Sequence, residues 1–107
     1  MIEQDIHKII SKIVKEFNPQ KVVLFGSYAW GSPKKNSDID LFIVKDDAKK
    51  NTREMAIDID GMLLPRTFPI DIIVCKPAQV EESLKDKNMF ITKIITKGKT
   101  LYDQRVL

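Results

Sequence analysis

The spacing of hydrophobic residues predicts an amphipathic helix near the start of the chain. Between residues 3 and 17, apolar side chains recur at the intervals of one helix face: Ile6, Ile9, Ile10, Ile13, Val14 and Phe17. Asn18-Pro19 is expected to end this helix, because proline disfavours helical backbone in the residue before it.

Three short apolar runs, rich in β-branched and aromatic residues, predict buried strands. They are residues 21–25, 38–44 and 70–75. A polar loop at 31–37 precedes the second run, and a short helix is expected at 28–31.

Two further helices and a last strand are predicted in the rest of the chain. A helix over residues 51–64 places Met55, Ile59, Met62 and Leu63 on one face. Another covers 78–97, with Lys87-Asn88 as the place where it would break and Gly98 as its C-cap. Residues 100–102 indicate a short final strand.

The order of these elements predicts a small α/β (α+β) domain. A mixed sheet covered by helices on at least one face accounts for the alternation of helices and strands. There are no internal repeats, and we expect residues 1–107 to form one domain.

Composition agrees with a globular protein and indicates its cellular compartment and the charge of its ligands. Hydrophobic residues make up 43% of the 107 residues and charged residues 31%, which excludes a disordered chain. Cys75 is the single cysteine, and Met1 to Lys12 has no apolar signal region, so a reducing cytoplasmic setting without a membrane is expected. The net charge of +3 permits an anionic ligand, although nucleic-acid binders usually carry a stronger basic bias.

Asp38 and Asp40 are the most informative residues. They lie two apart at the start of a predicted strand, so both side chains point to the same face, with Cα atoms roughly 6.6 Å apart. Carboxylates this close repel each other unless a cation lies between them, and Mg²⁺ commonly bridges carboxylates and phosphates. Asp71 would add a third carboxylate if its strand lies beside the second, which is enough for a site with two metal ions.

Gly26-Ser27 forms the second chemical element, directly after the first predicted strand. A glycine there lets the backbone approach a phosphate closely, and the Ser27 hydroxyl with nearby N–H groups would bind an anion. This is not a Walker A motif, because no Gly-Lys-Ser/Thr follows. Ser27 as a simple N-cap is the alternative, compatible with a phosphate contact.

Gly26-Ser27, ten residues and then Asp38-Ile39-Asp40 resemble the signature of the polymerase-β-like nucleotidyltransferase superfamily. Ser37-Asp38-Ile39-Asp40-Leu41 and the short length look most like its minimal (MNT) branch, over roughly residues 5–103. The resemblance implies a mixed sheet flanked by helices. It implies Asp38 and Asp40 as ligands of two Mg²⁺ ions, and Asp71 as the third carboxylate, which helps to activate the attacking hydroxyl.

The same resemblance implies ATP as substrate, with Gly26, Ser27 and Ser37 in contact with the nucleotide. Short members of this branch are often encoded beside a HEPN-domain protein, to which they transfer AMP as antitoxins. One departure concerns Trp30, which stands before Gly31 where family members often carry arginine. Lys34 or Lys35 could replace that cation.

Three functions follow as hypotheses. The first is transfer of AMP to a hydroxyl of a partner protein, since a chain this short has no domain to hold a nucleic-acid primer. The second is a module that neutralises a partner by contact with little or no catalysis. The third is extension of RNA 3′ ends with a partner subunit, and a homo-oligomer is compatible with each.

Several residues have simpler interpretations. Asp58 and Asp60 also form an Asp-x-Asp pair, but on a helix residues two apart point in different directions, so a solvated surface is expected. Tyr28 and Trp30 could stack on a base or pack beneath the loop. Surface or packing roles are expected for Cys75, His7 and the lysines Lys93, Lys97 and Lys99.

Overall fold

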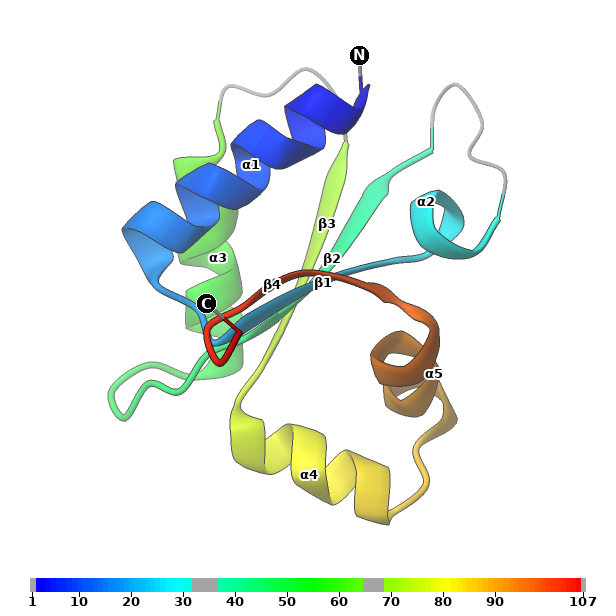
Figure 1. Cartoon of the computed structure of the whole chain (residues 1–107). Coiled ribbons are helices and arrows are strands. Elements are labelled where there is room, and N and C mark those ends of the chain that lie inside the picture. Colours follow the sequence, from blue (N-terminus) through cyan, green and yellow to red (C-terminus); the bar gives the residue numbers. More distant parts are fainter. Residues whose placement is uncertain (1, 32–36, 65–68, 107) are drawn as a thin grey trace.

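A computed structural model describes residues 2–31, 37–64 and 69–106 of the chain (Figure 1). Its strands are β1 Lys21–Phe25, β2 Ile39–Val44, β3 Ile70–Cys75 and β4 Lys99–Asp103. Its helices are α1 Ile2–Phe17, α2 Ser27–Trp30, α3 Thr52–Met62, α4 Pro77–Lys85 and α5 Met89–Lys97. The predicted loops at 31–37 and 65–69 lie mostly outside the described residues.

The four strands form one mixed sheet in the order β3-β2-β1-β4. β1 is antiparallel to both β2 and β4, whereas β2 and β3 run parallel. A parallel pair requires a crossover, which α3 provides between β2 and β3. The predicted mixed α+β fold is therefore confirmed, with the last short strand added at the edge beside β1.

One face of the sheet carries the larger core, against α1 and α3 (Figure 1). Alternating strand residues such as Leu24 and Leu41 point to this face, where Ile13, Met55 and Ile59 from the helices are fully buried. The predicted apolar stripe of the first helix is confirmed, because all six of its members pack here.

The opposite face is covered by α5, with Trp30 of α2 and Val80 of α4 at its border. Phe42 and Ile94 are fully buried in this second core, together with Val23, Phe25, Val44 and Ile91. Helices thus cover both faces of the sheet.

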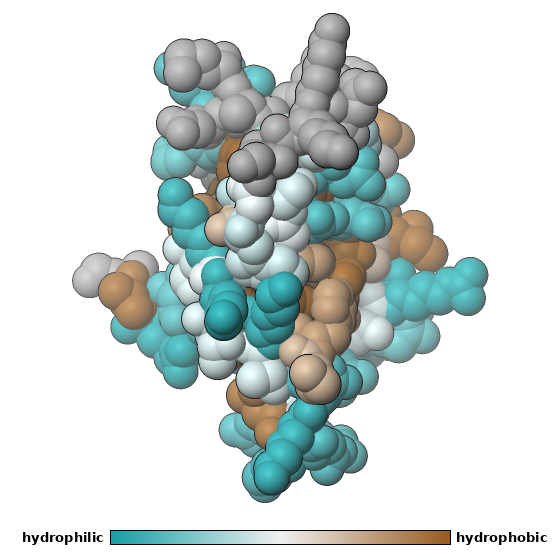
Figure 2. Space-filling model, turned by 90° about the vertical axis from the view of Figure 1, so that its right-hand side faces the viewer, coloured by the Kyte–Doolittle hydropathy of each residue, from teal (hydrophilic) through white to brown (hydrophobic). Residues whose placement is uncertain are grey.

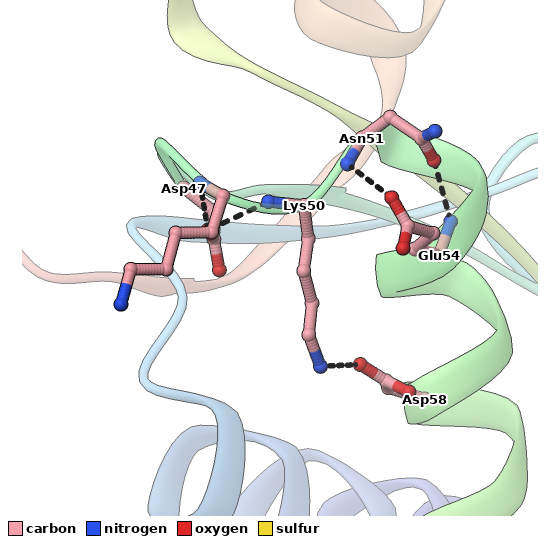
Figure 3. A network of polar contacts seen from close by, with 6 residues as sticks. Asp47, Lys50, Asn51, Glu54 and Asp58 are labelled. Carbon is pink, nitrogen blue, oxygen red and sulfur yellow. Dashed lines mark hydrogen bonds and ion pairs between the residues drawn. The ribbon is translucent and has the colours of Figure 1, made fainter.

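Helix α3 begins with a reciprocal capping box (Figure 3). The Glu54 N–H donates to the Asn51 side chain over 2.8 Å, and the Asn51 N–H donates to the Glu54 carboxylate over 3.1 Å. These bonds satisfy donors that the first helical turn would otherwise leave unpaired. One turn later, Asp58 accepts a hydrogen bond from the Lys50 ammonium on the helix surface.

The helix expected over 78–97 is two helices, separated at the predicted break. Lys87 adopts a left-handed φ of 56°, and the Asn88 side chain then accepts the Ile91 N–H over 3.0 Å as the N-cap of α5. Gly98 is the C-cap of α5, but its backbone is extended. A side chain there would overlap the Ile94 carbonyl and lie 2.6 Å from Val23, so close packing requires this glycine.

No helix among residues 2–31, 37–64 and 69–106 combines the length and apolar character that a membrane span requires.

Candidate active site

Strand pairing brings the predicted carboxylates to one end of the sheet. Asp40 in β2 is the direct partner of Asp71 in parallel β3, and of Phe25 in antiparallel β1. Neighbouring strands lie about 4.8 Å apart, so the two aspartates are adjacent across the sheet. The condition that the sequence left open, that the strand of Asp71 lies beside that of Asp38 and Asp40, is therefore met.

Asp38 lies immediately before β2, which begins at Ile39, one residue later than predicted. The Ile39 N–H donates to the Pro69 carbonyl over 2.9 Å, so the entries of β2 and β3 are tied together. Asp40 shares its side of β2 with Phe42 and Val44 of the second core. The carboxylates therefore open toward the face of α2 and α5.

The electrostatics of Asp40 reflect its burial and the two neighbouring carboxylates. Burial raises the pKa of Asp40 above its ordinary value, and the negative charges of Asp71 and then Asp38 raise it further. Asp40 is half-buried, whereas Asp38 and Asp71 are exposed. The site therefore has an inner carboxylate that resists ionisation, and two outer ones in contact with solvent.

Gly26 occupies the turn between β1 and α2 and faces Asp40. Its backbone has φ 76° and ψ −154°, a region that essentially only glycine adopts. A Cβ atom at this position would overlap Asp40 Oδ2 and lie 3.0 Å from Asp40 Cγ. The glycine thus brings bare backbone against the inner carboxylate.

Ser27 follows this turn directly, and Ser37 directly precedes Asp38. Gly26 is the N-cap of α2 and Ser27 its first residue, and no side chain caps the helix. The interpretation of Ser27 as the N-cap was therefore wrong, because the special backbone of Gly26 already starts the turn. Ser37 is half-buried just before Asp38 and has polar or electrostatic contacts of its own. Lys34 and Lys35 lie outside the described residues.

An aromatic cluster is centred on Phe25, the strand partner of Asp40. The Phe25 ring centroid lies 6.0 Å from that of Trp30 and 5.9 Å from that of Phe90. The Lys93 ammonium sits 4.3 Å from the centre of the Trp30 ring. Of the two uses considered for Trp30, packing is the one that the structure displays. Sequence reasoning missed the contact with Lys93, because it depends on how α5 packs after the break at Lys87.

The remaining candidates lie outside this site. Asp58 and Asp60 are in α3, and Asp58 pairs with Lys50 on the surface (Figure 3). Burial raises the pKa of the Cys75 thiol, which leaves it in its unreactive form. His7 is exposed on α1.

The carboxylate oxygens are donor atoms of the type that a hard divalent cation binds. Oxygen donors are what Mg²⁺ prefers, and a cation would relieve the repulsion that raises the pKa of Asp40. Within the described residues, no three acidic, His or Cys side chains are gathered as a complete ligand cluster. Mg²⁺ usually keeps several water ligands and binds phosphate oxygens, so it does not require a complete set of protein ligands.

A cavity of about 340 Å³ lies at the other end of the sheet. It is lined by the start of β1, the ends of β2 and β4, and α4, with Lys21, Val44, Leu84 and Arg105 among its residues. It is separate from the carboxylates, which stand at the opposite ends of β1 and β2.

The sequence model of one family, described as polymerase beta, nucleotidyltransferase, matches residues 7–106. The chain belongs to this family. The fold and the class of chemistry of the family agree with the mixed sheet and with the carboxylates Asp38, Asp40 and Asp71. Comparison with curated proteins finds no match.

Solved structures with a similar fold are toxin–antitoxin complexes. One is a "toxin-antitoxin with AMP-PNP", with 24% identity, a TM-score of 0.59 and coverage of 92% of this chain and 73% of that chain. A second is the "toxin-antitoxin MntA-HepT", with 22% identity, a TM-score of 0.53 and coverage of 92% and 70%. A third is a mutant of that pair with two aspartates changed to glutamate, with 23% identity, a TM-score of 0.56 and coverage of 92% and 73%. At these identities the similarity is one of fold.

Proposed function

We propose that this protein is an Mg²⁺-dependent nucleotidyltransferase that transfers AMP from ATP to a hydroxyl of a partner protein, as the antitoxin of a HEPN-type toxin. One observation carries the proposal. Asp40 and Asp71 are direct neighbours across parallel strands, Asp38 adds its charge, and the bare backbone of Gly26 faces Asp40.

The roles follow from the positions of these residues. Asp38 and Asp40, at the entry of β2, would hold two Mg²⁺ ions, and Asp71, the third carboxylate, would help to activate the attacking hydroxyl. When bound, the ions supply activation of the attacking hydroxyl and charge stabilisation of the leaving pyrophosphate. Gly26, which faces Asp40, would contact the triphosphate together with Ser27 and Ser37. The acceptor oxygen bonds to the α-phosphorus while the bond to the pyrophosphate oxygen breaks.

The exposure of the outer carboxylates permits a protein acceptor. Asp38 and Asp71 are exposed at one end of the sheet, so a Tyr, Ser or Thr hydroxyl on a flexible segment can reach them. Correct alignment of the hydroxyl with the α-phosphate is then supplied by the partner's own binding surface.

Two features of the structural neighbours support the pairing with a toxin. Their descriptions name toxin–antitoxin pairs, one of them with the ATP analogue AMP-PNP. A third carries changes at two aspartates that lie two positions apart, the same spacing as Asp38 and Asp40 here.

Intact-mass spectrometry tests the proposal. The HEPN-domain partner, incubated with this protein, ATP and Mg²⁺, should gain the mass of one or a few AMP units. Asp38→Asn, Asp40→Asn and Asp71→Asn should each abolish the gain, while Asp58→Asn serves as the matched control from the other Asp-x-Asp pair. An unmodified partner that is still bound and inhibited would support the contact-only module instead. Lengthened RNA in the same mixture would support 3′-end extension.

A further inference from the structure

Lys93 carries a positive charge that no carboxylate neutralises in the described part of the chain. Its ammonium lies 4.3 Å from the centre of the Trp30 ring, and this cation–π contact is the interaction that holds it. The surface ion pairs of the described residues involve other cations, Lys50 and Arg105. A cation held against a ring is restrained in position, yet its N–H donors remain available.

Trp30 has an unpaired donor at the same place. Its indole Nε1 is buried and has no hydrogen-bond acceptor among the described residues. Burying such a donor without an acceptor is unfavourable, and native proteins rarely leave one. An ammonium without a carboxylate and an indole N–H without an acceptor therefore meet at one ring, and an acceptor could satisfy either of them.

Phe25 connects this ring to the strand position of Asp40. Trp30 packs on Phe25 with ring centroids 6.0 Å apart, and Phe25 is the strand partner of Asp40. The molecule viewed from the side of α2 and α5 shows hydrophobic atoms reaching the surface among hydrophilic ones (Figure 2). Lys93 and Trp30 thus stand on the face toward which the carboxylates open.

We propose that Lys93, held on Trp30, is a positioning residue for the polyphosphate tail of the nucleotide. This rests on the proposed function, in which the α-phosphate lies at Asp38, Asp40 and Asp71. Bound there, the nucleotide extends a chain of negatively charged phosphates, for which an ammonium is a common ligand. Lys93 then favours triphosphates over monophosphates without touching the reacting atom.

Titrations that follow Trp30 fluorescence test this inference, since Trp30 is the only tryptophan of the chain. The variants are Lys93→Met, which keeps the apolar stem on the ring, Lys93→Arg, which keeps the charge, and Lys85→Met, which removes an exposed lysine from α4 as the control. Removal of a charge-assisted hydrogen bond predicts a loss of roughly tenfold or more in Mg·ATP affinity for Lys93→Met. AMP affinity should stay within about twofold, and Lys93→Arg should restore ATP binding.

The outcomes separate this inference from the proposed function. If wild type binds Mg·ATP and Lys93→Met binds it equally well, or if Lys85→Met loses as much, the role of Lys93 is refuted while the proposed function stands. If wild type does not bind Mg·ATP, the proposed function fails, and inorganic tripolyphosphate becomes the probe. Tripolyphosphate binding that Lys93→Met abolishes would support the anion subsite, and absence of such binding would refute it.

Discussion

Replacing Gly26 with alanine tests the closest contact in the candidate site. Gly26 lies in the turn after β1, with φ 76° and ψ −154°, and Asp40 stands directly against it. The added methyl group changes no charge and removes no hydrogen-bonding atom. Its effects therefore report on backbone conformation and on the position of the Asp40 carboxylate.

Two terms set the size of the effect. The backbone conformation of Gly26 costs about 1–3 kcal/mol for a residue with a side chain. In addition, the new Cβ would overlap Asp40 Oδ2 and lie 3.0 Å from Cγ and 3.3 Å from Cβ of that residue, so Asp40 must move. Asp40 sits between paired strands and cannot withdraw freely. We expect a loss of at least about 2 kcal/mol in the free energy of unfolding, or a shifted carboxylate with little remaining activity.

Urea denaturation and AMP transfer, measured on the same samples, show which outcome occurs. Gly61→Ala is the matched control, because a Cβ on Gly61 in α3 meets no atom within 4 Å. Because Gly61 lies in the last turn of α3, that change should stabilise the protein by at most about 0.5–1 kcal/mol and leave activity unaltered. A Gly26→Ala protein with wild-type stability and full activity would refute the placement of Asp40 against the turn.

Three further predictions concern the carboxylates and their surroundings. Without metal, Asp40→Asn should raise the melting temperature at neutral pH, because the raised pKa of Asp40 means that its ionisation destabilises the folded state. The gain should shrink as the pH falls through the raised pKa, because wild-type Asp40 then becomes protonated, and a gain independent of pH would contradict this. Trp30→Arg should destabilise the domain by about 1–3 kcal/mol, because it removes the ring between Phe25 and Lys93 and places two cations together. Thermal melts measure this loss, and wild-type stability would exclude a packing role for Trp30. In calorimetry, Mg²⁺ should bind weakly to the free protein and more tightly with ATP, because phosphate oxygens complete its shell, and ATP affinity independent of metal would count against the site.

Most of the fold could be predicted from local patterns. The apolar stripe of α1 identified the side chains that it buries, and the bounds of β1 and β3 agree with the predicted ones. The break between α4 and α5 was predicted at Lys87-Asn88, where Lys87 adopts a left-handed backbone. These features depend on residues close together in the chain, so periodicity and capping residues are enough to indicate them.

Part of the candidate site could be predicted from the sequence, and part of it depends on packing. Asp38, Asp40 and the turn at Gly26 could be named from their spacing, because alternation along a strand fixes the face of residues two apart. Their role in catalysis stays a prediction. The contact of Gly26 with Asp40 and the cation–π pair of Trp30 and Lys93 could not be predicted, since each joins elements brought together by packing alone.

By itself, the sequence determined most of the helical and strand segments and which residues are candidates for the chemistry, since both depend on short-range order. Only the tertiary structure decided that β3 lies parallel to β2 in a register that pairs Asp40 with Asp71. Register is decided by which apolar faces the sheet can bury, and a shift of one residue would turn Asp71 to the face of α1 and α3. The same burial makes Asp40 the inner carboxylate, because desolvation and the charges of Asp71 and Asp38 act only after the strands have met.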